Sequence, residues 1–255
     1  MRRNKYLENL NRIEFLVTFD CTGRCKHCSE GDHPFSGTYL DAKAAEDVVF
    51  KVAELYKIES VMTFGGEPLM YPECVFAIHD AARRCGIPKR QLITNGYFSK
   101  NPEKIKEVAR HISECGVNDL LLSVDAFHQE TIPLETVKLF ATELVALEVR
   151  VRTNPAWLVS REKCNTYNIE TERIVKEFAS LGVKEGEGNV IFPEGNALKY
   201  LTEYFDTDKE YINPYEDDPC NIRSFSVEPD GRVLGKNIFE EDILDILREY
   251  KPTEN

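Results

Sequence analysis

The sequence predicts an α/β protein built around a parallel sheet. Six short runs rich in apolar and β-branched residues recur along the chain, at residues 14–19, 60–64, 91–94, 119–123, 148–152 and 188–192. Most of the intervals between them are close to the roughly thirty residues of a strand-helix-strand unit. Because such units coil right-handedly, they build either an open doubly wound sheet or part of a barrel.

The segments between these runs carry helical periodicity. Residues 105–115 place apolar side chains three and four positions apart, and residues 137–145 repeat the pattern after Pro133, which suits a first helical turn. We therefore expect helices to cover one face of the sheet. In both architectures ligands gather at the carboxyl ends of the strands.

The character of the chain changes after about residue 205. An acidic, turn-rich stretch is followed by "FSVEPDGRVLG", which predicts a hairpin around Pro229, Asp230 and Gly231. The amphipathic stretch "EEDILDILREY" predicts a final helix. We expect a core domain over residues 1–204 and a small hairpin-plus-helix extension over residues 205–255.

Composition excludes several classes of protein. A formal net charge of −12 lacks the basic footprint of a nucleic-acid binder. The chain has no apolar run of the ~18 residues that span a membrane, and its N-terminus lacks the pattern of a signal peptide. Eight cysteines in such a chain indicate metal ligands or buried thiols rather than disulfides. We expect a cytoplasmic protein that binds neither nucleic acid nor membrane.

Three of these cysteines are clustered directly after the first predicted strand. In "FDCTGRCKHCSEG", Cys21, Cys25 and Cys28 are separated by three and two residues, a spacing that lets thiolates converge on one soft metal centre. Zinc would need a fourth ligand from elsewhere, because His27 adjoins Cys28 too closely to share its ion without strain. A four-iron four-sulfur cluster can instead leave its fourth iron open to a small molecule.

The chain resembles the radical S-adenosylmethionine superfamily. The resemblance rests on the three-cysteine signature with His27 before the third cysteine, and on "GGEP" at residues 65–68 after the second predicted strand. It covers roughly residues 12–200 and implies a partial six-unit TIM-like barrel of alternating strands and helices. It also implies that Cys21, Cys25 and Cys28 hold one four-iron four-sulfur cluster whose open iron takes S-adenosylmethionine.

The resemblance also implies residues that contact S-adenosylmethionine, each just after a predicted strand. They are Gly65, Gly66, Glu67, Asn95, Ser123, Asp125, Arg152 and Asn154. The two glycines would let the backbone approach the ligand, and an arginine suits a carboxylate through a bidentate contact. Strand alternation places Ser123 and Asp125 on one side, and Arg152 and Asn154 likewise. His128 is a candidate for contact with the substrate.

The C-terminal tail resembles the start of the twitch or SPASM modules, which bind auxiliary clusters through several cysteines. Here Cys220 and the hairpin are present, but "VLGKN" stands where the next cysteine would fall, and no cysteine follows. One thiol cannot hold a cluster of the usual four-cysteine type. We expect a cluster-free remnant. Either Cys220 or His128 can serve as a catalytic hydrogen donor. In "PEGNA", Asn196 replaces the arginine that relatives carry.

The resemblance implies an enzyme that reductively cleaves S-adenosylmethionine to a 5′-deoxyadenosyl radical, which abstracts hydrogen from a substrate. A ribosomally made peptide that becomes cross-linked or epimerised is the leading substrate class, and a small molecule is the alternative. Expected partners are a reductant such as flavodoxin or ferredoxin and, for a peptide, a separate recognition protein. A non-catalytic scaffold that holds zinc or an inert cluster is the rival of a different class.

Overall fold

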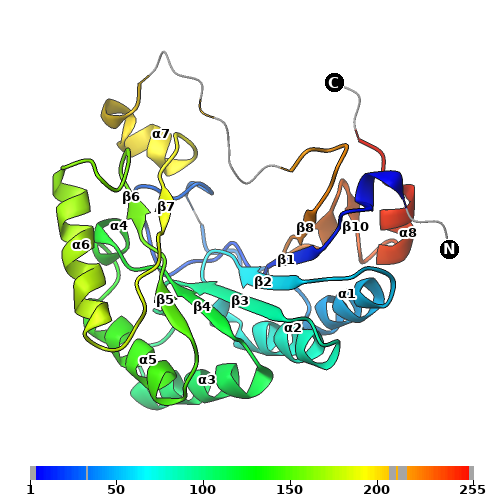
Figure 1. Ribbon diagram of the computed structural model, residues 1–255, viewed down its shortest axis with the longest axis horizontal. Helices are drawn as coiled ribbons and strands as arrows, with labels where there is room; N and C mark the ends of the chain where they lie inside the picture. The colour runs from blue at the N-terminus through cyan, green and yellow to red at the C-terminus, as the bar shows by residue number, and fades with distance from the viewer. Residues whose placement is uncertain (1–3, 33, 207–210, 212–216, 253–255) are drawn as a thin grey trace.

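The computed structural model describes residues 4–32, 34–206, 211 and 217–252, and centres on a six-stranded sheet curved like part of a barrel (Figure 1). The strand order is β5-β4-β3-β2-β1-β8, and all neighbours are parallel. The strands are β1 (Arg12–Leu16), β2 (Ser60–Phe64), β3 (Lys89–Thr94), β4 (Asp119–Leu122), β5 (Val151–Thr153) and β8 (Ser224–Val227). Strands β5 and β8 form the two edges, so the sheet is an open partial barrel, as predicted.

One of the six predicted strands was assigned to the wrong sheet. Residues 188–192 contribute β7 (Asn189–Val190), which pairs with β6 (Ala156–Trp157) in a separate two-stranded sheet. The sixth strand of the main sheet is β8, which lies parallel to β1. The predicted boundary after residue 204 therefore does not coincide with a boundary of the sheet, because the C-terminal segment supplies one of its edge strands.

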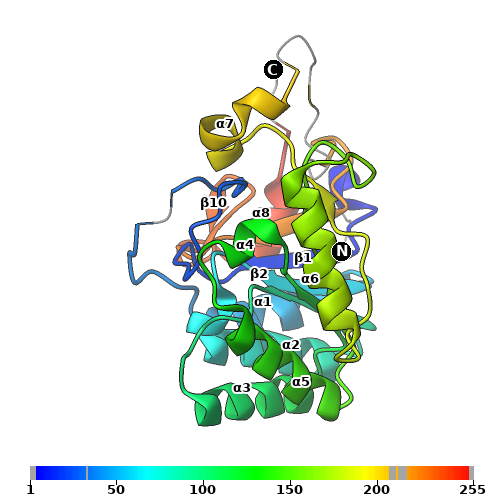
Figure 2. The same ribbon diagram turned by 90° about the vertical axis from the view of Figure 1, so that its left-hand side faces the viewer.

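Helices cover the convex face of the sheet (Figures 1 and 2). These are α1 (Ala42–Leu55), α2 (Pro72–Arg84), α3 (Pro102–Cys115), α5 (Leu134–Ala146) and α6 (Thr166–Ala179). Of the shorter helices, α8 (Ile243–Glu249) packs against α1, whereas α4 (Ala126–Gln129) and α7 (Asn196–Tyr200) lie at the carboxyl end of the sheet and not on its convex face (Figure 1). Three 3-10 turns, η1 (Lys5–Leu7), η2 (Pro68–Met70) and η3 (Thr202–Tyr204), complete the set in the described ranges.

Local sequence sets the helix ends. Asp41 caps α1 by accepting a hydrogen bond from the Ala44 N–H. Asn101 caps α3 ahead of Pro102. Proline is tolerated at this first helical position because an N–H there would have no partner within the helix. Gly116 ends α3 with φ at 90°, a left-handed conformation that favours glycine.

Strand alternation separates the core from the concave face. On β1, Ile13 and Phe15 are fully buried against the helices, while Glu14 and Leu16 point to the other side. Burial of a side chain of this size stabilises the fold by roughly 1.5–3 kcal/mol. The helix-facing residues thus form the main core and leave the concave face to the site.

The C-terminal segment contains the predicted turn and final helix. The Glu228 N–H donates to the Arg232 carbonyl across the turn at residues 229–231. Its arms belong to different sheets, because β9 (Arg232–Val233) pairs with β10 (Lys236–Asn237) rather than with β8. Helix α8 follows as expected. Within the described ranges, no helix combines the length and apolarity needed to cross a bilayer.

Candidate active site

A cavity of about 280 Å³ opens at the carboxyl end of the sheet. Leu16, Phe64 and Ile93 from β1, β2 and β3 form its apolar floor. The predicted site residues that line it are Cys21, Cys25, Cys28, Gly65, Gly66, Asn95, Ser123, His128 and Asn154. The structure therefore brings together residues from five separate strand-to-helix connections, which follows from the parallel order of the strands.

The three cysteines lie on one loop after β1. Cys25 is buried, and Cys21 and Cys28 are half-buried. A Cβ placed on Gly23 would lie 3.3 Å from the Cys25 Sγ and 3.6 Å from the Cys21 Sγ, so this glycine keeps the space between the two sulfurs open. Burial and, to a smaller extent, the negative charge of Glu67 together raise the pKa of the Cys21 thiol to about 12.

Two anchors that the sequence did not reveal hold this loop. Asp20, directly before Cys21, accepts hydrogen bonds from the backbone N–H groups of Ser36 and Gly37 and from the Tyr71 hydroxyl. At the other end, Asn196 donates through Nδ2 to the carbonyl oxygens of Cys25 and Gly31. In the sequence, the only signals of these anchors were the acidic residue before the first cysteine and the asparagine in "PEGNA".

Gly65 and Gly66 have a different physical role from the one expected. A Cβ on Gly65 would lie 2.5 Å from the Thr18 carbonyl oxygen, and one on Gly66 would lie 2.3 Å from that of Asp20. The Gly66 N–H donates to the Thr18 carbonyl at 2.7 Å. The glycines therefore let the two strand ends approach each other, and in doing so they form one wall of the cavity.

Glu67 supports this wall from behind and does not line the cavity. Its fully buried carboxylate accepts hydrogen bonds from the Thr94 hydroxyl and from the backbone N–H groups of Leu69 and Asn95. Burial nevertheless raises its pKa to about 7. Asn95 itself faces the loop, since its Nδ2 lies 3.2 Å from the Thr22 hydroxyl and 3.6 Å from the Cys21 Sγ.

Strand alternation suggested that Ser123 and Asp125 would contact the same ligand, but the structure places their side chains in different surroundings. Ser123 lines the cavity, whereas Asp125 is fully buried and caps α4. The Asp125 carboxylate accepts from the backbone N–H groups of Phe127, His128 and Ala156 and from the His128 ring. These donors hold its pKa below the ordinary value despite burial. Asp125 therefore does not line the cavity itself, but it contacts His128, which does.

Two predicted site residues lie away from the cavity. Arg152 forms a bidentate pair with Asp119 on β4, at 2.9 and 3.1 Å, so its guanidinium is already engaged. Cys220 is exposed and precedes β8, whose first residue pairs with Arg12 at the amino end of β1. Because the strands are parallel, Cys220 lies at the opposite end of the sheet from the three clustered cysteines. Cys220 does not line the cavity, so the expectation that it donates hydrogen there gains no support from its position.

The donor set fits a metal cluster bound through three thiolates. Three cysteine side chains reach one cavity. Burial raises the pKa of Cys21 and of Cys28, so a bound cation, rather than the protein, would favour the thiolate forms of these two residues. No other cysteine lines the cavity in the described ranges, which leaves a coordination position for another group. The partial barrel and this site define a cluster-binding α/β protein.

The chain belongs to the radical SAM superfamily, whose family model matches residues 15–154. Members of this superfamily use a four-iron four-sulfur cluster and S-adenosylmethionine as cofactors. The three cysteines, the two glycines and Asn154 all lie within the matched segment. The three cysteine thiols of this site are thus suitable ligands for the cluster that the family uses.

Curated relatives carry one recurring name. A GTP 3',8-cyclase of Tolumonas auensis is 29% identical over 126 residues, which cover 49% of this chain and 35% of that protein. A probable GTP 3',8-cyclase of Saccharolobus solfataricus is 23% identical and aligns with 93% of this chain and 86% of its own length. The match to the first of these therefore spans only about a third of the relative.

Solved structures share the fold. Streptococcus suis SuiB bound to its precursor peptide SuiA superimposes with a TM-score of 0.62 at 14% identity, over 95% of this chain and 65% of that one. The enzyme anSMEcpe with bound S-adenosylmethionine gives a TM-score of 0.58 at 16% identity, over 95% and 81%. At these identities the likeness concerns the fold.

Proposed function

We propose that this chain is a radical SAM enzyme that acts on an extended peptide held over the cavity. The observation that carries the proposal is the convergence of Cys21, Cys25 and Cys28 on a cavity that the Gly65–Gly66 backbone also lines. When bound, the cofactors supply reductive cleavage of S-adenosylmethionine and the hydrogen-abstracting 5′-deoxyadenosyl radical.

The protein's own residues bind, orient and exclude water. The three cysteines would hold the cluster, and S-adenosylmethionine would bind beside it in the same cavity. Asn95, Ser123 and Asn154 offer polar side chains to the rest of that molecule. Leu16, Phe64 and Ile93 keep the floor apolar, which protects a reactive radical from side reactions.

The charge of the cavity supports a peptide over a nucleotide. Among the described residues, no lysine or arginine lines the cavity, whereas Glu30 does. Burial and the negative charges of Glu194 and Glu228 raise the pKa of Glu30. A triphosphate would meet this carboxylate without a lysine or arginine to bind it, while a neutral or cationic segment would be favoured.

A free strand edge lies beside the same cavity. Asn189 and Val190 of β7 line it and are exposed. The Asn189 N–H donates to the carbonyl of Pro155, just before β6, and the Ile191 N–H donates to that of Trp157. These bonds direct the Val190 N–H and C=O away from β6. An extended peptide can add to such an edge through main-chain hydrogen bonds, and strand addition is a common mode of peptide recognition. Cross-linking and epimerisation are the candidate outcomes.

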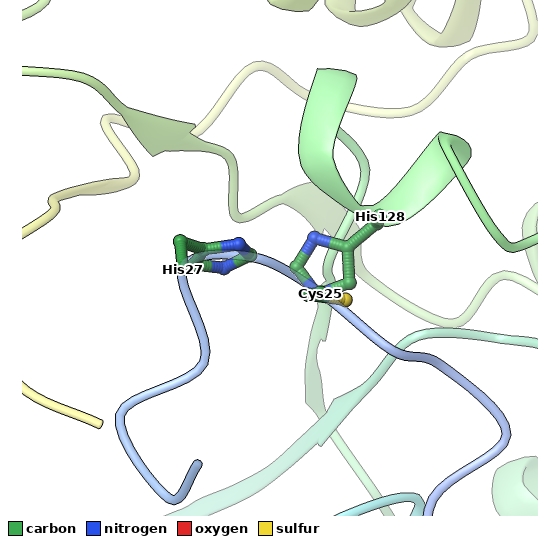
Figure 3. Close-up of side chains that lie close together, drawn as sticks. All are labelled: Cys25, His27 and His128. Atoms are coloured by element: carbon green, nitrogen blue, oxygen red, sulfur yellow. The ribbon is translucent and has the colours of Figure 1, made fainter. Parts of the chain in front are cut away.

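A small-molecule substrate is the second candidate, and the shared name of the curated relatives favours it. The rival of a different class is a non-catalytic scaffold. It is supported by Cys25, His27 and His128, whose ligand atoms lie within 4.8 Å of one another and suit a single zinc ion (Figure 3). We further propose a cytoplasmic location, flavodoxin or ferredoxin as reductant, and a separate protein that recognises the peptide.

The decisive experiment is anaerobic reconstitution with iron and sulfide, followed by dithionite, S-adenosylmethionine and chromatographic detection of 5′-deoxyadenosine. We expect product from the wild type and from Cys85→Ala, a cysteine that caps α2 outside the cavity, but none from Cys25→Ala. Absence of product despite a full, reducible cluster would support the scaffold. If GTP rather than cationic peptides stimulates the formation of 5′-deoxyadenosine, the result would favour the small-molecule candidate.

A further inference from the structure

A second cavity, of about 720 Å³, lies at the amino end of the sheet. Arg12, Ser60 and Lys89 line it; they are the first residues of β1, β2 and β3 and are register partners across these strands. Because the strands are parallel, this amino-end cavity lies at the opposite end of the sheet from the cysteine loop. Its volume is within the range of about 300–1,000 Å³ that is usual for small-molecule sites.

Ser60 brings a buried hydroxyl to the amino-end cavity. The residue is only 8% exposed, and its Oγ has no hydrogen-bond partner in the part of the chain that the structure describes. Buried hydroxyls in folded proteins nearly always have a partner, because an unpaired one costs folding free energy. A partner from outside the chain, either a ligand or a water, would satisfy this one.

Two cations share the strand register of this hydroxyl. The Arg12 guanidinium is held in place, because it donates to the side-chain oxygens of Glu14 and Gln91. A guanidinium carries more N–H donors than these bonds use, so others are left for a ligand. Lys89 is exposed and forms no ion pair with any described residue. The starts of the three strands therefore offer three different donors to one ligand.

The charges around the amino-end cavity favour an anion. Lys57 and Glu59 also line it, and they pair with each other at 3.4 Å. Since Arg12 is paired with Glu14, Lys89 is left as the unpaired charge among the lining residues that the structure describes. A cation without a partner attracts an anion even in a chain with a net charge of −12.

Apolar side chains line the rest of the amino-end cavity. Ala53 and Tyr56 come from the end of α1, and Ile87 follows the end of α2. Tyr56 and Ile87 are buried. The carbonyl ends of two helices carry partial negative charge, which disfavours an anion beside them. The anionic group of a ligand is therefore expected at the strand starts, and its apolar part at the helix ends.

We propose that the amino-end cavity binds a small organic phosphate, whose phosphate group contacts the starts of β1, β2 and β3 and whose apolar body packs against the ends of α1 and α2. A phosphate offers three acceptor oxygens to the three donors, one more than a carboxylate, and arginine and lysine both bind phosphate well. The inference goes beyond the proposed function and depends neither on the cluster nor on its substrate.

The test is isothermal titration calorimetry of the full chain with phenyl phosphate, inorganic phosphate and benzoate. We expect phenyl phosphate to bind in a single site, more tightly than inorganic phosphate, which lacks the apolar body, and than benzoate, which lacks the third oxygen. Lys89→Gln should weaken its binding roughly tenfold, because a charged donor is lost. Lys100→Gln, which changes an exposed lysine outside the amino-end cavity, should match the wild type.

Ser60→Ala distinguishes a ligand from a water. Because the hydroxyl has no partner in the described chain, the variant should melt no earlier than the wild type, yet it should bind phenyl phosphate more weakly. Equal affinity in the wild type, Lys89→Gln and Ser60→Ala would overturn the inference and leave a water as the partner of Ser60. Benzoate binding as tight as that of phenyl phosphate would also overturn it. Neither result bears on the proposed function, which 5′-deoxyadenosine formation tests separately.

Discussion

The side-chain amide of Asn196 donates a hydrogen bond of 3.2 Å to the main-chain carbonyl of Cys25, 171 residues earlier in the chain. The same amide reaches the Gly31 carbonyl, and the Asn196 N–H bonds to the Cys28 carbonyl. The start of α7 is thus a clasp across the cysteine loop.

Asn196→Ala should loosen the cysteine loop. The change leaves two carbonyl oxygens without their donor, which costs roughly 1–3 kcal/mol where the group stays buried. We expect a lower urea midpoint and less iron bound per chain after reconstitution. Asn9→Ala, which removes only an exposed bond to Asn221, is the matched control. Iron loading equal to that of the control would show that the clasp is dispensable.

Gly66→Ala should disrupt the site more severely. Its Cβ would fall 2.3 Å from the Asp20 carbonyl oxygen, a main-chain atom that can yield only if the strand ends separate. Gly86→Ala is the comparison, because a Cβ there meets no atom within 4 Å and bears only the strain of a positive φ. We expect Gly66→Ala to be the less stable variant by thermal melting and to bind no cluster. Equal melting temperatures would contradict this.

Cys220→Ala should leave both cluster loading and product stereochemistry unchanged. The residue is exposed and lies at the amino end of the sheet, away from the cavity. Mass spectrometry of the product in heavy water would reveal any change in the source of a returned hydrogen. A change in deuterium incorporation would restore Cys220 as a donor and imply a large rearrangement of the C-terminal segment.

Arg152→Leu should reduce stability without a specific effect on cofactor binding. Asp119 has a side chain only 7% exposed, and its pKa is held below the ordinary value chiefly by Arg152 against the effect of burial. Loss of one partner of such a pair costs on the order of 3 kcal/mol. The double variant with Asp119→Leu should recover part of the loss. Calorimetry should show S-adenosylmethionine affinity close to that of the wild type in every folded variant.

Glu67 should make the metal-free protein less stable as the pH rises. Its folded-state pKa of about 7 lies above the ordinary glutamate value of 4.5. Below pH 4.5 both the folded and the unfolded state are protonated, and between the two values only the folded state is. The stabilisation falls through this window by up to about 3 kcal/mol and is lost above pH 7. Urea midpoints at pH 5 and pH 8 should therefore differ more in the wild type than in Glu67→Gln, and parallel profiles would refute this prediction.

Local patterns predicted the parts of the fold that depend on neighbouring residues. Strand alternation, helix caps and the spacing of Cys21, Cys25 and Cys28 all lie within short windows. The sequence did not predict that Asp119 pairs with Arg152. Each of these two charged residues could equally contact a ligand, and only the register of the adjacent strands shows that they contact each other. Likewise β6, two residues long, is too short for any periodic signal.

The placement of β8 sets the order in which this chain can fold during synthesis. Strand β1 pairs with β2 once residue 64 is available, but its second edge stays open until residue 227 has emerged. Closing a loop of that length is slow, and an open strand edge invites wrong pairings meanwhile. The cysteine loop follows β1 directly, so the ribosome releases the metal ligands long before the sheet beneath them is complete.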